Sequence, residues 1–240
     1  MLDSIREPQD VLMAGLIALE RRRTGSRSRR ISPSQAGDCR RRVWLNMTGQ
    51  EPVNQTKRLP ALIGTGFHAL AAEGLQKIDP SASRWLVEQR VQAESFAGLV
   101  SGQVDCYDTL TRTVIDWKTT KKASLGWLSK GAVLGKSADK WPSAQQLWQV
   151  QLYGWLLAEN GHDVERVCLV GVAKDGDEDH LRQHVIAYDP AVAHEALEWI
   201  ATVSSLTEAP APEEHPNFCR SYCSFYTADG SVCSGRTSEQ

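Results

Sequence analysis

Two short stretches of the sequence carry carboxylates and a lysine at a spacing that a β-hairpin would bring together. They are Ser-Gly-Gln-Val-Asp at 101–105 and Val-Ile-Asp-Trp-Lys at 114–118. Residues two apart on a strand share a face, so Asp116 and Lys118 point the same way. If the hairpin is centred between residues 110 and 111, Asp105 lies opposite Asp116, with Cβ atoms about 4.5–5.5 Å apart. Carboxylates at that separation repel each other, and a divalent cation that bridged them would remove the repulsion.

A site of this kind predicts a hard cation and phosphoryl chemistry. Carboxylate oxygens are ligands that suit Mg²⁺ or Mn²⁺. Such an ion can polarise a phosphoryl oxygen and generate hydroxide near neutral pH. Lys118, on the same face, would orient the attacking water or stabilise the growing negative charge. The alternative is an ordinary surface hairpin in which Asp116 and Lys118 are solvated charges.

Three further side chains are candidates for the same site. His68 follows Gly64 and Gly66 on an expected helix, where small residues allow close approach to another backbone, and its imidazole could be an additional metal ligand. Gln149 and Tyr153 are four apart on another expected helix, so they share a face. Both can hydrogen-bond to phosphate or to the catalytic carboxylates. Each of the three also has an ordinary alternative, as a packed histidine or a solvated helix face.

Four of the six cysteines lie outside the expected strands, as Cys39 and then a C-terminal cluster of Cys219, Cys223 and Cys233. Three clustered cysteines with one distant partner can close a four-cysteine site that joins the N-terminal helix to the tail. Zinc and iron–sulfur clusters both accept four thiolates. The alternative is three unrelated cysteines in the tail. The other two, Cys106 and Cys168, lie within expected strands and are predicted to be buried thiols.

The apolar periodicity predicts an α/β fold with one central mixed sheet flanked by helices. Strands are expected at 85–94, 99–107, 113–118, 165–173 and 181–188. Helices are expected at 7–23, at 34–49 with Ser34 as the N-cap, and at 61–76, 142–159 and 190–206. We expect a single domain with an N-terminal helical and basic segment (1–60), a core (61–206) and a Cys-rich C-terminal segment (207–240).

The formal net charge is only −2, but the charge is unevenly distributed. Nine arginines and one acidic residue lie between Arg21 and Arg42, and a local basic stretch can bind a polyanion whatever the net charge. Neither a secretory signal nor an apolar run of the roughly 18 residues that a membrane span needs is visible. We therefore expect a cytoplasmic protein without a membrane partner, in which cysteines are ligands or free thiols more often than disulfides.

Taken together, the motifs resemble those of the PD-(D/E)XK nuclease superfamily. The closest match is its RecB-like branch, which includes the iron–sulfur CRISPR-associated exonucleases and the AddB-type helicase–nucleases. The ordered set is a Gly-x-x-His-like motif at 64–68, Gly-x-Val-Asp at 102–105, Asp-x-Lys at 116–118 and Gln-h-x-x-Tyr at 149–153. One cysteine precedes the set and three follow it. The chain departs from the pattern in having Asp116 where Glu is common, and in a looser spacing of the last three cysteines.

The resemblance implies a restriction-endonuclease-like core and metal-assisted hydrolysis of DNA phosphodiesters, usually from an end. It implies that His68, Asp105 and Asp116 bind Mg²⁺ or Mn²⁺, helped by the Trp117 carbonyl, and that Lys118 is the catalytic lysine. Gln149 and Tyr153 would help to position DNA. The four outer cysteines, Cys39, Cys219, Cys223 and Cys233, would hold a [4Fe–4S] cluster, with zinc as the alternative.

The expected partner is DNA, either single-stranded or at the end of a duplex. Arg40, Arg41 and Arg42 would belong to a basic segment that lines the entry channel for the strand. A recombination, phage or CRISPR-adaptation protein would be a further partner. The rival hypothesis is a catalytically silent DNA-binding or assembly module with a structural zinc or iron–sulfur site. A third is a zinc protein that binds RNA.

Overall fold

The structure is a computed structural model that describes residues 30–54, 56–125, 141–213 and 216–235. The strands are β1 (Trp85–Ser95), β2 (Gly98–Asp108), β3 (Thr113–Thr120), β4 (Arg166–Ala173) and β5 (Leu181–Ala187). The helices are η2 (Pro33–Gln35), α2 (Arg40–Met47), α3 (Leu59–Ile78), η3 (Lys122–Leu125), α4 (Ala144–Glu159), α5 (Pro190–Ser204) and α6 (Pro216–Tyr222). The predicted strands and the three long helices α3, α4 and α5 are confirmed, with ends within two residues of the prediction. The helix predicted at 7–23 and the arginines before Arg30 lie outside the described residues.

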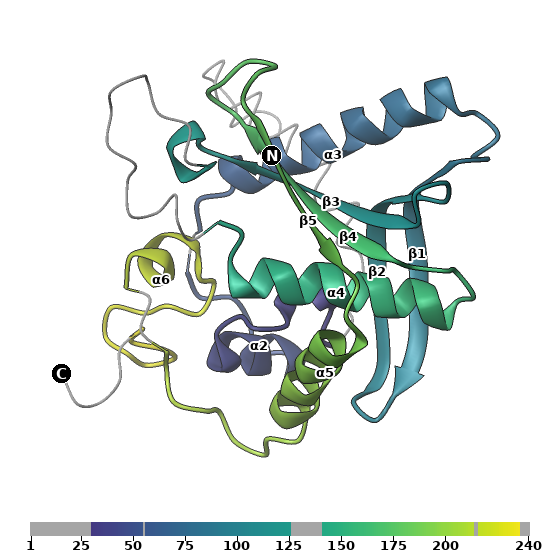
Figure 1. The fold of residues 1–240 in the computed structure, drawn as a ribbon. Helices are drawn as coiled ribbons and strands as arrows, with labels where there is room; N and C mark the ends of the chain where they lie inside the picture. Colours follow the sequence, from purple (N-terminus) through teal and green to yellow (C-terminus); the bar gives the residue numbers. More distant parts are fainter. Residues whose placement is uncertain (1–29, 55, 126–140, 214–215, 236–240) are drawn as a thin grey trace, which may run out of the picture.

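The five strands form one mixed sheet in the order β1-β2-β3-β4-β5. Neighbouring strands are antiparallel except for β3 and β4, which are parallel. A parallel pair needs a long crossover connection, and this connection contains α4. The predicted central mixed sheet flanked by helices is therefore confirmed (Figure 1).

Helices pack on both faces of the sheet. On one face, α4 and α5 enclose the main apolar core, in which Leu152, Leu156 and Val114 are fully buried. On the other face, Gly64 of α3 lies against the side chain of Thr119 on β3. Thr119 and Val114 are an odd number of residues apart on β3, so their side chains point to opposite faces of the sheet. As a result, α3 and α4 can deliver side chains to the same stretch of β3 from two sides.

The hairpin of β2 and β3 has the predicted register. Cys106 pairs with Ile115 and Tyr107 pairs with Val114, so the hairpin is centred between residues 110 and 111. The ladder contains only three pairs, although both strands continue beyond it. Asp105 and its counterpart on β3 are the first residues past the last pair, at the point where the two strands stop pairing.

The helix predicted at 34–49 is wrong in its first half. Ser34 lies inside the 3₁₀ turn η2 and does not cap the longer helix, because α2 begins only at Arg40. Between them, Gly37 has a φ of +79°, and a Cβ at Gly37 would come within 3.2 Å of the Trp148 ring on α4. The interruption follows from packing against α4, which the apolar periodicity of the segment does not record.

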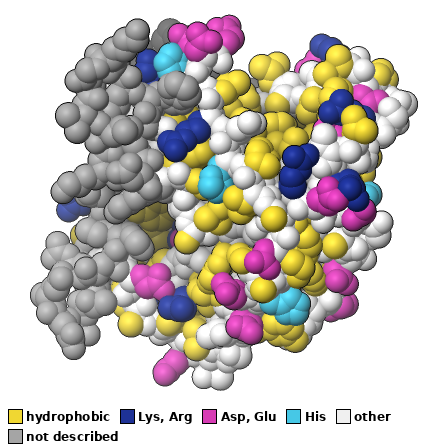
Figure 2. Space-filling model, in the orientation of Figure 1, with side chains coloured by type: hydrophobic (Ala, Val, Ile, Leu, Met, Phe, Trp, Pro, Cys, Tyr) yellow, Lys and Arg dark blue, Asp and Glu magenta, His cyan; other side chains and the backbone are white. Residues whose placement is uncertain are grey.

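No helix among the described residues is long and apolar enough to cross a membrane. On the face shown in Figure 2, the lysine and arginine side chains of the described residues are scattered among aspartate and glutamate side chains. The described part of that face therefore offers local positive charges and no extended basic patch.

Candidate active site

Asp105 is held at the end of the β2–β3 ladder from two directions. Its Oδ2 accepts a hydrogen bond from the backbone N–H of Trp117 at 2.9 Å. Its Oδ1 lies 3.1 Å from Nδ1 of His68 on α3, and this contact is the main reason that the pKa of His68 is raised. The sheet and α3 thus bring together two of the predicted ligands. Trp117 meets Asp105 through its N–H, and the role of its carbonyl as a ligand stays a prediction.

Two glycines of the predicted motifs allow close approaches around this point. A Cβ at Gly64 would lie 3.3 Å from the hydroxyl of Thr119, so glycine lets α3 approach β3. A Cβ at Gly102 would lie 2.8 Å from the ring of Tyr153, so glycine lets β2 approach α4. A Cβ at Gly66 would have no described atom within 4 Å, so the expectation that Gly66 aids the approach of α3 is wrong.

Asp116 is almost completely buried, with 1% of its surface exposed, and its charge is only partly compensated. Its Oδ1 accepts a hydrogen bond from Nε2 of Gln149 at 3.2 Å. Nζ of Lys118 is 2.7 Å from Oδ2, close enough for an ion pair, yet no described donor is oriented to hydrogen-bond to Oδ2. Burial is the main cause that raises the pKa of Asp116, Lys118 opposes it, and Asp105 raises it further. A bound cation would satisfy both the carboxylate charge and this oxygen.

Gln149 and Tyr153 form the α4 side of the site. Both are buried, and Nε2 of Gln149 also donates a hydrogen bond to the Tyr153 hydroxyl at 3.1 Å. This contact confirms that the two residues share a face of the helix. Because Gln149 bonds to Asp116 and to Tyr153 together, the geometry gives the pair a part in orienting the Asp116 carboxylate. Their contact with DNA stays a prediction.

Glu88 on β1 is a candidate ligand that the sequence analysis missed. One ligand atom each from His68, Glu88 and Asp105 all lie within 4.8 Å of one another, a spacing at which they could hold a metal ion. Glu88 has a φ of +53°, in the left-handed region that costs a residue with a Cβ about 1–2 kcal/mol. The side-chain amide of Gln103 donates hydrogen bonds to the carboxylate and the backbone carbonyl of Glu88. Strain of this kind is often found at ligand-binding positions.

The alternation of core-facing and outward-facing residues along β1 is interrupted near Glu88. This interruption is the sequence signal that could have identified Glu88. Leu86 and Val91 both pack against the main core, which residues five apart on a regular strand cannot do. The same interruption occurs on β2, where Val104 and Tyr107 both belong to that core. The pairing register is constant across the interruption. Both strands are therefore irregular at the same place, where Glu88 lies across from Asp105.

The residues at this point fit a divalent cation of the Mg²⁺ or Mn²⁺ class. The carboxylates of Glu88 and Asp105 and the imidazole of His68 supply hard oxygen and nitrogen ligands within reach of one ion. Asp116 adds a buried carboxylate on the α4 side of the site. Burial is the main cause that raises the pKa of the Tyr153 hydroxyl, and the charges of Asp116, Asp105 and Glu88 raise it further.

The predicted DNA-positioning arginines contact the C-terminal segment. Arg40 forms an ion pair with Glu213 at 3.5 Å. Arg41 donates hydrogen bonds to the backbone carbonyls of Pro210 and Val232, at 2.9 and 2.8 Å. Arg42 forms an ion pair with Asp38 at 2.9 Å, and its guanidinium lies over the ring of Phe218 in the C-terminal segment. These contacts tie α2 to the tail, and the role of the arginines in DNA binding stays a prediction.

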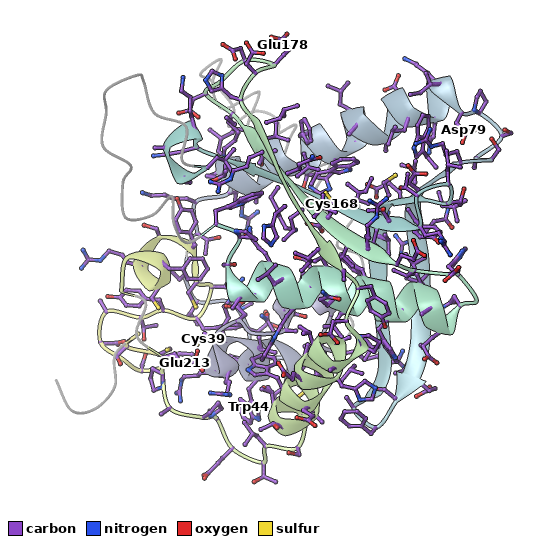
Figure 3. All side chains as sticks on the ribbon, viewed as in Figure 1. Cys39, Trp44, Asp79, Cys168, Glu178 and Glu213 are labelled. Atoms are coloured by element: carbon purple, nitrogen blue, oxygen red, sulfur yellow. The ribbon has the colours of Figure 1, made fainter. Side chains whose placement is uncertain are left out.

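The four outer cysteines line one cavity between α2 and the C-terminal segment, and Figure 3 shows Cys39 beside Glu213 at this junction. The cavity is lined by Cys39, Cys219, Cys223 and Cys233 together with Arg42, Leu45 and Phe225. None of the four forms a disulfide with another described cysteine, and no three of their sulfurs lie within 4.8 Å of one another. The fold thus brings Cys39 next to the three cysteines of the C-terminal segment, because all four line the same cavity. Cys106 and Cys168 are buried free thiols, as predicted.

No family model and no curated protein matches the sequence. Among solved structures, the chain is similar to that of SSO0001, with a TM-score of 0.55 and 19% identity over 92% of this chain and 95% of that one. A phage-related exonuclease from Haemophilus somnus 129PT has a TM-score of 0.47 and 13% identity over 69% and 77% of the two chains. The alkaline exonuclease LHK-Exo from Laribacter hongkongensis has a TM-score of 0.47 and 12% identity over 75% and 88%. The similarity to SSO0001 is one of fold, over nearly the full length of both chains.

Proposed function

We propose that the protein is a metal-dependent nuclease that hydrolyses DNA phosphodiester bonds at the end of the β2–β3 ladder. The observation that carries this proposal is the state of Asp116: a buried carboxylate with a raised pKa, one oxygen without a directed donor among the described residues, and Lys118 beside it. Groups that are only partly compensated are expensive to bury, and they gather at reaction centres.

His68, Glu88, Asp105 and Asp116 would hold Mg²⁺ or Mn²⁺. When bound, the ion polarises a phosphoryl oxygen and lowers the pKa of a water. The protein contributes an arrangement of ligands that exists before the ion arrives, because the Trp117 N–H, the His68 ring and the Gln149 amide already fix the carboxylates. Ligands held in this way bind a cation without a large loss of side-chain freedom.

Lys118 supplies the electrostatic part of the mechanism. Its ammonium is held 2.7 Å from Asp116 and its side chain is 22% exposed, so it can face a substrate phosphate. From that position it stabilises the negative charge that grows on the phosphoryl oxygens, and it can donate a hydrogen bond to the attacking water. Gln149 keeps the neighbouring carboxylate oriented while the phosphate enters.

The motif order supports an exonuclease of the RecB-like kind, acting from a DNA end. The test is a time course on end-labelled single- and double-stranded DNA with Mg²⁺, Mn²⁺ or a chelator. We expect progressive shortening with either ion and none with the chelator. Asp116→Asn should abolish the activity, whereas Asp163→Asn, at a mostly exposed carboxylate, should retain it. DNA binding by the wild-type protein without any cleavage would support the silent-module hypothesis instead.

We further propose that Cys39, Cys219, Cys223 and Cys233 hold a [4Fe–4S] cluster. All four thiols line one cavity between α2 and the C-terminal segment, which supports a group that the four share. The order of the motifs favours an iron–sulfur cluster over zinc as that group. Anaerobically purified protein should contain about four irons per chain. Cys223→Ser should lose the iron and Cys168→Ala, at a buried thiol elsewhere, should keep it; a colourless wild-type protein with one zinc would contradict the proposal.

A further inference from the structure

A hollow adjoins the candidate active site on the part of the β1–β2 hairpin that lies beyond Glu88. It encloses about 920 Å³ of space open to solvent, and we call it the β1–β2 groove. Its polar lining consists of Arg90, Gln92, Ser101, Gln103 and Asn160. Arg90 is paired with Gln103 and Gln92 with Ser101 across the two strands. Directly opposed residues share a face, so these four side chains form one continuous polar surface.

The charge of the groove favours an anionic ligand. Arg90 is exposed and has no ion-pair partner among the described residues. No carboxylate is among the described lining residues, so the described part of the groove carries one positive charge, that of Arg90. Its other polar side chains are amides and a hydroxyl, which can donate hydrogen bonds to phosphate oxygens without being charged.

The groove is continuous with the candidate metal ligands through Gln103. This residue lines the groove, and its amide donates hydrogen bonds to Glu88. Glu88 in turn has a carboxylate oxygen within 4.8 Å of ligand atoms of His68 and Asp105. A polymer bound along the groove would therefore extend to the candidate metal ligands. Figure 1 shows that the β1–β2 hairpin extends away from α3.

We propose that the β1–β2 groove binds the phosphate backbone of the single DNA strand that is attached to the bond being cleaved, with Arg90 as its cationic contact. The proposal rests on the proposed nuclease function, since it assigns the path of the substrate to that site. A polar groove with one cation and several neutral donors suits a backbone that must slide, because no base-specific pocket is needed.

Binding of a fluorescent single strand, dT20, to protein carrying Asp116→Asn with chelator present tests the groove without any cleavage. We expect Arg90→Gln to raise the Kd about fivefold and to reduce the slope of log Kd against log salt concentration by about 0.7, the loss of one phosphate contact on a single strand. Arg90→Lys should retain most of the affinity, since it keeps the charge. The matched control is Lys77→Gln, which removes an exposed cation of α3 and should not change the Kd.

An unchanged Kd for Arg90→Gln, or an equal loss for Lys77→Gln, would overturn the proposal. Competition by an equally charged polyglutamate peptide as strong as that by unlabelled dT20 would overturn it too, because the groove would then accept any polyanion segment. The nuclease function is judged separately, from cleavage by the wild-type protein. Cleavage that depends on Asp116, combined with unaltered binding by Arg90→Gln, would refute the groove alone. Weakened binding without wild-type cleavage would refute the nuclease alone.

Discussion

The carboxylates at the two ends of the β2–β3 hairpin differ in how far neighbouring groups compensate their charge. At the turn end, Asp108 is paired with Arg84 at 2.8 Å and also accepts hydrogen bonds from the backbone N–H groups of Leu110 and Thr111. At the other end of the ladder, Asp116 is buried beside Asp105 with one oxygen that no described donor satisfies. The pKa of Asp108 is lowered to about 2, mainly by Arg84, while burial raises the pKa of Asp116. A carboxylate that is fully paired and hydrogen-bonded stabilises the fold, and one that is buried and only partly compensated is suited to bind a ligand.

The largest effect expected from this comparison is on cleavage. Asp116→Asn or Lys118→Ala should lower the single-turnover rate by about 10³-fold or more, since each removes a group that acts on the transition-state charge. The free energy of unfolding of metal-free Asp116→Asn should fall by no more than about 1 kcal/mol, because relief of burial and of the repulsion from Asp105 offsets the lost ion pair with the partly exposed Lys118. Lys77→Ala, on the exposed surface of α3, is the control for Lys118→Ala and should cleave at the wild-type rate.

At the turn end, the same kind of substitution should act on stability and leave chemistry unchanged. Asp108→Asn should lower the free energy of unfolding by about 2 kcal/mol, because charge-assisted bonds to Arg84 and to the turn are weakened. Urea denaturation at neutral pH measures the change. Asp163→Asn, at an exposed carboxylate, should change it by less than about 0.5 kcal/mol. Loss of cleavage by Asp108→Asn protein that remained folded would contradict a purely structural role for Asp108.

The pH dependence of stability gives a smaller effect with a defined sign. Asp108 has a folded-state pKa below its unfolded value, so its contribution is complete above about pH 4 and is lost as the pH falls toward 2. Because Arg84 is 42% exposed, we expect the loss to be about 1–2 kcal/mol, less than the shift alone would give. The difference in the free energy of unfolding between wild-type and Asp108→Asn protein, measured from pH 5 to pH 2, gives this loss. If that difference stayed constant with pH, the ion pair between Asp108 and Arg84 would not be the source of the stabilisation.

The smallest expected effect concerns the strained residue at the ligand end. Glu88→Gly should raise the free energy of unfolding of the metal-free protein by about 1 kcal/mol, because glycine adopts a positive φ without cost and a repelling carboxylate is lost. The same variant should need more Mn²⁺ to reach half-maximal cleavage. Gln89→Gly, at the next position of β1, should instead destabilise the chain by a similar amount. If both glycine variants were destabilised alike, Glu88 would carry no releasable strain.

The features of the site that follow from strand parity and turn position were predictable. The turn centre placed Asp105 opposite Asp116, and a spacing of two placed Lys118 on the same face as Asp116; the pairing of Cys106 with Ile115 and the contact between Lys118 and Asp116 agree with both. These are local consequences of a regular hairpin, so they need no knowledge of the remaining chain.

What escaped prediction depends on contacts between distant segments or on irregular backbone. Glu88 lies beside His68 and Asp105 because β1 and β2 both depart from regular alternation of core-facing and outward-facing residues at the same place. A prediction that assumes regular alternation along each strand does not detect this irregularity. The break of the 34–49 helix at Gly37 reflects the Trp148 ring on α4. Neither the position of that ring nor the phase of two paired strands is encoded within one short window of sequence.

The proposed nuclease site requires a divalent ion to bind at Asp105, the residue that contacts His68 and lies in the same ligand group as Glu88. A titration of the protein with Mn²⁺, followed by the electron paramagnetic resonance signal of the free ion, measures this binding without DNA. We predict saturable binding by the wild-type protein and an affinity at least tenfold weaker for Asp105→Asn, with Asp163→Asn unchanged. Equal binding by the wild-type and Asp105→Asn proteins would contradict a metal site at Asp105.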